Sequence, residues 1–280
     1  MIDKALFRIA AAFAALALTV APACAQDFTP QVGQYGKDVI WVPSPDDVVE
    51  RMLTMAQTTP NDYVIDLGSG DGRIAIMAAK KFGARAMGVE YNPDMVRLSQ
   101  KNAQAAGVAG KASLKQADIF TTDFSQATVV TMYLLPSLNL KLRPLILAMK
   151  PGTRIVSHSF SMDDWTADEV SNVDGKRAYF WIVPANVQGT WSLEMTAEGR
   201  TERAELSLEQ HYQQISGAVM RGPIAEGLRE PRLRGFRVAF GHVDAAGVQR
   251  EFNGRVTGDK MEGSFRTFGG TEGRWTAARR

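Results

Sequence analysis

The chain has 280 residues, of which 45% are hydrophobic and 22% are charged. This balance is typical of a globular protein and excludes a disordered or fibrous one. The formal net charge of +2 is too small to predict a nucleic-acid partner. The length leaves room for one large domain or two ordinary ones.

The first 25 residues carry the features of a secretory signal peptide. Lys4 and Arg8 precede an apolar run over 9–20, and small residues at 23–25 offer a cleavage site before Gln26. The run is shorter than the roughly 20 apolar residues of a membrane-spanning helix. We therefore expect export, with the periplasm as the destination, or a membrane tether if the leader is not cleaved. No membrane span is predicted in the mature chain.

Cysteine occurs only once, as Cys24, inside this leader. We therefore expect a mature chain with no disulfide, no cysteine nucleophile and no cysteine-based zinc site. A chain without cysteine suits an oxidising compartment.

Residues 41–185 alternate short apolar runs with helical patterns, which predicts βαβ units and a mostly parallel sheet. Ser44 is predicted to cap a first helix, with Pro45 at the first helical position. Further helices are expected over 73–82, over 92–106, where Asn92-Pro93 is predicted to cap the start, and after Pro136. Strands are expected over 63–67, 86–90, 112–117, 127–134 and 152–157. Asp174-Gly175 separates two more apolar runs and predicts a hairpin. The expected fold is a Rossmann-like α/β sheet closed by a hairpin, with residues 26–40 as an N-terminal linker.

From residue 186 to residue 280 the pattern changes to short runs in which apolar and polar residues alternate between glycines. This pattern predicts a small antiparallel all-β domain that closes into a barrel or a sandwich. Gly189 and Trp191 at its start are similar to the opening strand of lipocalin-like barrels. Such a module could stabilise or dimerise the protein, or it could present a substrate or bind an envelope component.

The chemistry is concentrated in the glycine-rich run 66–72, between the first strand and the helix that follows it. Gly68 and Gly70 allow the backbone to turn sharply and to approach a ligand closely. Their spacing is G-x-G-x-G, whereas the loop that places a pyrophosphate at a helix N-terminus reads G-x-G-x-x-G. Asp66 would repel a pyrophosphate, but it suits the ammonium group of S-adenosylmethionine (SAM). This pattern disfavours an NAD-dependent oxidoreductase.

Other polar residues are expected around the same cofactor. Glu90 ends the second strand, where an acid can accept hydrogen bonds from ribose hydroxyls. Asp118 follows the third strand and could take the adenine amino group while Ile119 covers the ring; a helix cap is the alternative role for Asp118. The complete predicted cofactor-binding set is Asp66, Gly68, Ser69, Gly70, Asp71, Glu90, Asn92, Asp118 and Ile119.

Tyr133 is the candidate catalytic residue, because it ends the fourth strand beside the position that the methyl group must occupy. Its alternative role is a half-buried aromatic of the core. His158 follows the fifth strand and is predicted to be a buried, hydrogen-bonded structural residue. Methyl transfer mainly needs donor and acceptor held in line, so no metal is predicted. A lysine acceptor could lose its proton through desolvation alone.

Residues 40–184 resemble class I SAM-dependent methyltransferases. More narrowly, they resemble the protein-lysine methyltransferases that act on the mitochondrial ATP synthase c-subunit and on the adenine nucleotide translocase. The resemblance is carried by residues 42–44, 66–73, 88–93 and 135–137. It implies SAM as the cofactor and N-methylation of a protein lysine as the reaction. The export signal and the β module depart from that family.

One alternative from a different class is open at the level of sequence. The chain could be a SAM-fold protein that no longer catalyses and binds a small ligand or an envelope partner through its β module. The intact glycine run, with Glu90 and Asp118 at their expected places, favours the enzyme, because a decayed site should have lost some of these residues.

Overall fold

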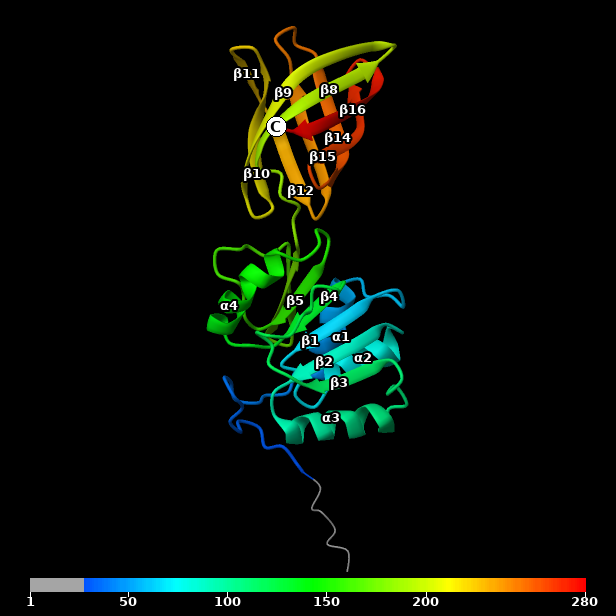
Figure 1. The fold of residues 1–280 in the computed structure, drawn as a ribbon, viewed down its shortest axis with the longest axis vertical. Helices are drawn as coiled ribbons and strands as arrows, with labels where there is room; N and C mark the ends of the chain where they lie inside the picture. The colour runs from blue at the N-terminus through cyan, green and yellow to red at the C-terminus, as the bar shows by residue number, and fades with distance from the viewer. Residues whose placement is uncertain (1–27) are drawn as a thin grey trace, which may run out of the picture.

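The structure is a computed structural model that describes residues 28–280, so the predicted leader over 1–25 lies outside the described residues. The described chain forms an α/β unit followed by an all-β unit, which Figure 1 shows one above the other. The first unit is built on a seven-stranded sheet and the second on a nine-stranded sheet. In the described part of the chain, no helix has the length and apolar character needed to cross a membrane.

The α/β unit alternates strands and helices as the sequence predicts. Its strands are β1 (Tyr63–Leu67), β2 (Arg85–Glu90), β3 (Ala112–Gln116), β4 (Val129–Met132), β5 (Arg154–His158), β6 (Glu169–Val173) and β7 (Lys176–Ile182). Its helices are α1 (Asp46–Met55), α2 (Arg73–Lys81), α3 (Pro93–Ala105) and α4 (Pro136–Leu147). The strand order is β3-β2-β1-β4-β5-β7-β6, with β1 to β5 parallel and β7 antiparallel to β5. This arrangement confirms the predicted Rossmann-like sheet closed by a hairpin.

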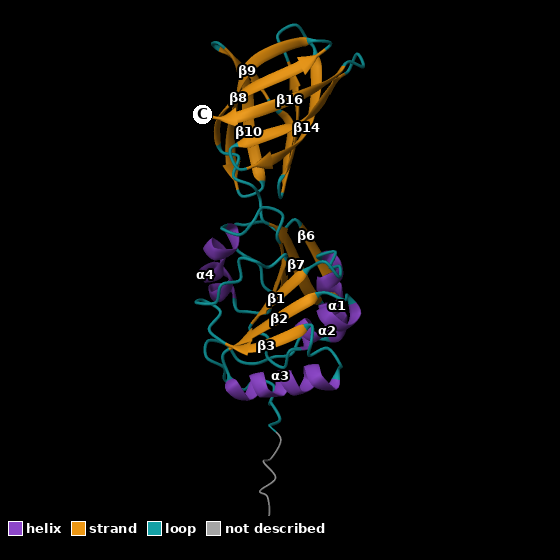
Figure 2. Ribbon diagram, turned by 45° about the vertical axis from the view of Figure 1, so that its right-hand side comes forward, coloured by secondary structure: helices purple, strands orange, loops and turns teal. Residues whose placement is uncertain are grey.

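Both faces of this sheet are covered, because its central strands are apolar on both sides. In β1, Val64 points into a core shared with α1, α2 and α3, whereas Ile65 and Leu67 point into a second core shared with α4. Figure 2 shows α4 on the opposite side of the sheet from α1 and α2. Trp165 and Trp181, both fully buried, complete the second core.

The predicted serine cap of α1 is wrong. The N-cap is Pro45, which has no side-chain cap hydrogen bond, and Ser44 lies one residue before it. The Ser44 hydroxyl lies instead 2.8 Å from Nδ1 of His158 at the end of β5. A hydrogen bond to a buried imidazole has replaced the local cap. By contrast, the predicted cap of α3 is confirmed, since Asn92 Oδ1 accepts from the backbone N–H of Asp94 at 2.9 Å.

The all-β unit is an up-and-down sheet that is nearly closed. Its strands are β8 (Gly189–Ala197), β9 (Arg200–His211), β10 (Gln214–Arg221), β11 (Ile224–Gly227), β12 (Arg229–Arg234), β13 (Arg237–Val243), β14 (Gln249–Thr257), β15 (Lys260–Thr267) and β16 (Glu272–Arg279). The first and last strands, β8 and β16, pair antiparallel, and the sheet ends at β11 and β12. Alternate residues such as Trp191, Phe252 and Trp275 point inward and are buried, as the period-two pattern predicts.

The two units touch through a small set of side chains. Nε1 of Trp165 donates to Oε1 of Gln213, in the turn between β9 and β10, at 3.0 Å. The ring of Tyr212 stacks on that of Trp165 with centroids 5.8 Å apart, and its hydroxyl donates to Asp164 at 3.0 Å. These contacts fix the base of the all-β unit to the second core of the α/β unit.

Candidate active site

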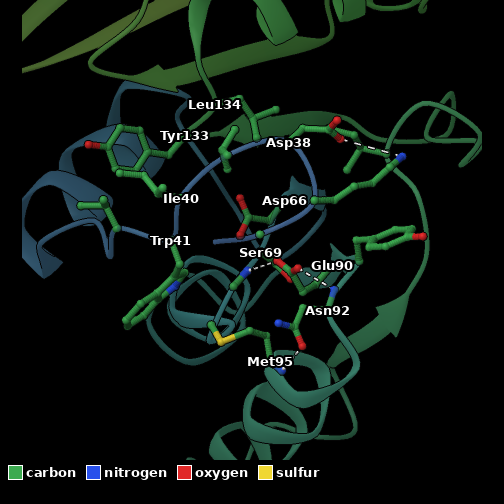
Figure 3. A pocket seen from close by; sticks show the side chains of 18 of the residues that line it. Asp38, Ile40, Trp41, Asp66, Ser69, Glu90, Asn92, Met95, Tyr133 and Leu134 are labelled. Carbon is green, nitrogen blue, oxygen red and sulfur yellow. Dashed lines mark hydrogen bonds and ion pairs between the residues drawn. The ribbon is translucent and has the colours of Figure 1, made fainter. Parts of the chain in front are cut away.

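A pocket opens at the carboxyl ends of β1, β2, β3 and β4 (Figure 3). Parallel strands end at the same edge of a sheet, so residues that follow different strands converge there. The pocket is lined by every residue that the sequence analysis assigned to cofactor binding or catalysis, namely Asp66, Gly68, Ser69, Gly70, Asp71, Glu90, Asn92, Asp118, Ile119 and Tyr133.

The glycine run turns at the mouth of this pocket, between β1 and α2. Gly68 and Gly70 have φ values of 78° and 51°, which side chains disfavour. A Cβ at Gly68 would lie 2.9 Å from a methyl carbon of Leu134, and one at Gly70 would lie 2.7 Å from Nε1 of Trp41. A side chain at either position would therefore strain the backbone and have to displace the neighbouring side chain of Leu134 or Trp41.

Asp66 is the most perturbed acid of the pocket. Its Oδ1 accepts the hydroxyl of Thr131 on β4 at 2.7 Å, whereas its buried Oδ2 has no hydrogen-bond partner. Burial raises the pKa of Asp66 to about 7, and the charges of Asp71 and Glu90 act in the same direction. A cationic group would satisfy Oδ2 and stabilise the carboxylate, so this residue fits the ammonium group of SAM.

Glu90 connects the glycine run to the start of α3. Its Oε2 accepts the backbone N–H of Gly70 and its Oε1 accepts that of Asn92, both at 2.9 Å; Figure 3 shows these bonds. Each carboxylate oxygen can accept a second hydrogen bond. Glu90 can therefore hold the loop in shape and still accept from ribose hydroxyls.

Residues 34–43, which we call the strap, form a wall of the pocket that the sequence analysis missed. Nζ of Lys37 lies 2.6 Å from Oδ2 of Asp118 and 4.9 Å from the centre of the Tyr91 ring. The strap bends back on itself, with a bridge between Tyr35 and Ile40. The predicted linker over 26–40 includes most of this segment, because its role depends on residues remote in the sequence, such as Gly70, Tyr91 and Asp118.

Asp118 has two structural partners in addition to its place in the pocket. Its Oδ1 accepts the backbone N–H of Phe120 at 2.8 Å, and its Oδ2 accepts from Lys37. The hydrogen bond from Lys37 is the main cause that lowers the pKa of Asp118. The alternative role as a cap is thus partly present, but Asp118 caps a turn and not a helix.

The opposite end of the pocket is apolar and aromatic. Tyr133 is half-buried there, and its ring centre lies 3.9 Å from that of His158 and 6.1 Å from that of Phe160. His158 is buried and bonded to Ser44, as predicted, and burial lowers its pKa to about 4. Its imidazole is therefore neutral at neutral pH. Among residues 28–280, no group of three or more potential metal ligands is assembled.

Comparison with known proteins agrees with this geometry. A sequence model of the ANTKMT methyltransferase domain matches residues 66–169. A protein-lysine N-methyltransferase of Saccharolobus islandicus is 46% identical over 142 residues, which cover 50% of this chain and 88% of the relative. The lysine N-methyltransferase of the ATP synthase c-subunit in Homo sapiens is 35% identical over 132 residues, which cover 47% of this chain and 56% of the relative.

A solved structure supports the same assignment. The crystal structure of an RNA methyltransferase from Salinibacter ruber in complex with S-adenosyl-L-homocysteine is 48% identical, with a TM-score of 0.51 over 52% of this chain and 96% of that chain. Fold and pocket together define a SAM-dependent methyltransferase. The chain belongs to the same methyltransferase family as the Saccharolobus islandicus relative, of which it covers 88% at 46% identity.

Proposed function

We propose that this enzyme transfers the methyl group of SAM to the side-chain amine of a protein lysine. One observation carries the proposal: a single pocket combines the unpartnered, buried carboxylate oxygen of Asp66 with the aromatic surface of Tyr133 and Phe160. The acid suits the cationic tail of the cofactor, and the aromatic end suits a cationic or desolvated amine. The lysine-specific relatives support the choice of acceptor.

The polar residues of the pocket have separate roles in holding the cofactor, which supplies an electrophilic methyl group. Asp66 would accept the ammonium group, and Glu90 would accept the ribose hydroxyls. Asp118 would accept the adenine amino group, with Ile119 against the ring. Asp66 lies near the end of β1, Glu90 ends β2 and Asp118 follows β3, so the sheet sets the spacing of these three acids.

The aromatic end would prepare the acceptor. A lysine is protonated in water, and its amine attacks only after losing the proton. An apolar wall disfavours the charged form and so lowers the pKa of the amine. The neutral imidazole of His158 adds no positive charge to this wall. Tyr133 and Phe160 would then hold the amine in line with the methyl group, which is the main requirement of the reaction.

The acceptor can be tested with labelled SAM and a pool of synthetic peptides in which random residues flank one central lysine. We expect label in the lysine peptides and none in a matched pool with central arginine. RNA is the second candidate acceptor in this test, since the Salinibacter ruber relative is named an RNA methyltransferase. Label in RNA alone would overturn the proposed acceptor. SAM binding without any transfer would instead support the non-catalytic alternative.

A further inference from the structure

Against Tyr133 lies a buried pair of polar side chains, Ser44 and His158, that the cofactor-binding roles above do not use, although Ser44 also lines the pocket. The hydroxyl of Ser44 lies 2.8 Å from Nδ1 of His158, and the imidazole lies against the Tyr133 ring. Ser44 is only 4% exposed and His158 only 2% exposed, and Nε2 of His158 has no hydrogen-bond partner. Leaving a buried polar atom unpaired costs free energy. Packing alone would therefore favour an apolar residue in place of His158.

Tyr133 needs external support to hold its ring in one orientation. β4 ends at Met132, so Tyr133 is the first residue beyond the strand. His158, by contrast, is the last residue of β5 and is paired with Ala178 of β7. The sheet therefore anchors the imidazole, and the Ser44 hydroxyl restricts rotation of the ring about its own side-chain bond, a torsion that is otherwise broad.

Ser44 is in turn connected to the glycine run. Its carbonyl oxygen accepts from Nη1 of Arg73 at 2.8 Å, and Nη2 of the same guanidinium lies 2.7 Å from Oδ2 of Asp71. One chain of contacts thus leads from the cofactor side of the pocket to the ring of Tyr133. Each link is at hydrogen-bonding or ring-contact distance.

The charge state of the pair suits an amine acceptor. Burial is the main cause that lowers the pKa of His158, the charge of Lys176 lowers it further, and Asp47 acts in the opposite direction. A neutral ring behind Tyr133 adds no charge to this end of the pocket, so a lysine can enter while still protonated and lose its proton there. An imidazolium at the same place would repel the protonated lysine as it enters.

We propose that Ser44 and His158 are positioning residues that orient the Tyr133 ring toward the acceptor amine. The proposal rests on the proposed function, because it assigns the ring of Tyr133 to the acceptor end of the pocket. In this proposal neither Ser44 nor His158 holds the cofactor through its side chain. Substitutions of these side chains should therefore slow methyl transfer and leave the affinity for SAM unchanged.

The first test compares Ser44→Ala with Thr153→Val. Thr153 is equally buried, and its hydroxyl donates to the carbonyl of Lys150 just before β5, at the other end of the strand from His158. We expect Ser44→Ala to lower kcat/KM for the acceptor roughly tenfold to a hundredfold, the range for a small misplacement, with the Kd for SAM unchanged within about twofold. Thr153→Val should change neither constant. A loss of SAM affinity equal to the loss of kcat/KM would overturn the proposal.

The second test asks whether Ser44 acts through the ring of Tyr133. In a Tyr133→Phe background, which keeps the ring, Ser44→Ala should still lower kcat/KM. In a Tyr133→Leu background, which removes the ring, Ser44→Ala should cause no further loss of kcat/KM. The reason is that the effects of substitutions at coupled residues are not additive. Full additivity in the Leu background would show that Ser44 acts independently of Tyr133.

A third readout needs no acceptor and therefore separates this proposal from the proposed function. The imidazole signals of His158, assigned in NMR spectra by their loss in His158→Gln, should be shifted by the ring current of Tyr133. In Ser44→Ala they should move toward unstacked positions, whereas Thr153→Val should leave them in place. Signals that do not move in Ser44→Ala would overturn the positioning role. A wild type that methylates no amine would instead overturn the proposed acceptor.

Discussion

At the scale of single residues, Asp66 shows a conflict between stability and function. The folded protein holds this carboxyl with a pKa of about 7, well above its ordinary value of 3.8, because burial disfavours the ionised form. The protonated form is therefore the one that stabilises the fold. Its contribution is fully present below pH 4 and is lost as the pH rises through 7. A carboxylate at this place is explained by the ligand and not by packing.

This conflict predicts opposite effects of Asp66→Asn on stability and on binding. Asparagine keeps an oxygen for the Thr131 hydroxyl but removes the charge. Above pH 7 we expect the melting temperature of the cofactor-free variant to be higher than that of the wild type. The free energy of unfolding should rise by at most a few kcal/mol, since one pKa unit corresponds to about 1.4 kcal/mol. Below pH 4 the two proteins should melt alike. Thermal scans across pH 4–8 provide the measurement.

The same variant should bind SAM more weakly, by roughly tenfold to a hundredfold, the cost of losing a hydrogen bond to a charged group. For the wild type, SAM affinity should increase with pH and level off above about 7, as the carboxyl ionises. Titration calorimetry at several pH values measures both effects. An Asp66→Asn protein with wild-type SAM affinity would show that the ammonium group binds elsewhere.

Glu90→Ala should weaken SAM binding by roughly 1.5–3 kcal/mol. The loss has two sources, since the carboxylate would bind ribose and also holds the N–H groups of Gly70 and Asn92. We therefore expect a lower melting temperature even without SAM. Glu169→Ala is a control, because Glu169 forms only an exposed ion pair with Arg51. Unchanged SAM affinity in Glu90→Ala would place the ribose elsewhere.

At the scale of elements, the strap decides how the pocket is closed. Its attachments include an exposed ion pair, Lys37 to Asp118, the contact of Lys37 with the Tyr91 ring, a 3.6 Å contact of Gln34 Nε2 with Met95 Sδ, and the close approach of Trp41 to Gly70. Exposed ion pairs contribute little to stability, and salt screens them. The strap is thus the part of the pocket wall that can open with least cost.

Lys37→Met should therefore speed the release of SAM a few-fold while leaving the melting temperature nearly unchanged. Stopped-flow measurements of SAM dissociation would detect this change. Added salt should speed release from the wild type and have less effect on Lys37→Met, because the ion pair is then already absent. Lys115→Met, at an exposed position on β3 outside the pocket, is the control. Slower release from Lys37→Met would mean that Lys37 displaces the cofactor from Asp118.

At the scale of the whole molecule, the α/β unit contains the complete pocket. All lining residues lie between positions 34 and 160. The aligned region makes up 88% of the Saccharolobus islandicus relative, which leaves that protein no room for nine further strands. We therefore propose that the boundary near residue 185 separates two units that fold on their own cores.

A variant that ends at Ala185 should fold and bind SAM with an affinity within about tenfold of the longer chain, a difference of about 1.4 kcal/mol. Its melting temperature should fall, because Trp165 loses its contacts with Gln213 and Tyr212. Gln213→Ala in the longer chain measures the share of the Gln213 side chain, which contacts Trp165 and also donates to the Thr166 carbonyl. An insoluble truncated protein, or one that does not bind SAM, would mean that both units share one folding core.

The N-terminus carries a prediction about location. We propose that residues 1–25 direct export and are then removed. Mass spectrometry of the protein from its native cells should find Gln26 as the first residue. Intact protein with Met1, recovered from the cytoplasm, would contradict the proposal.

The sequence by itself determined the α/β order, the approximate positions of the strands and ten of the residues that line the pocket. These features depend on local patterns: apolar runs, the glycine run at 66–72 and the Asn92 cap. Because parallel strands end at one edge, Asp66, Glu90 and Asp118 converge without further information. The change to period two after residue 186 likewise predicted the second unit.

Three features were decided by the tertiary structure alone. The strap forms a wall of the pocket, Ser44 pairs with His158, and His158 lies against the ring of Tyr133. Lys37 meets Asp118 from 81 positions away, and Ser44 meets His158 from 114 positions away. A short sequence pattern carries no information about such distant pairs. The local signal of Ser44 favoured a helix cap, and the buried imidazole prevailed because an unpaired polar group inside a core costs more than an unmade cap at a helix end.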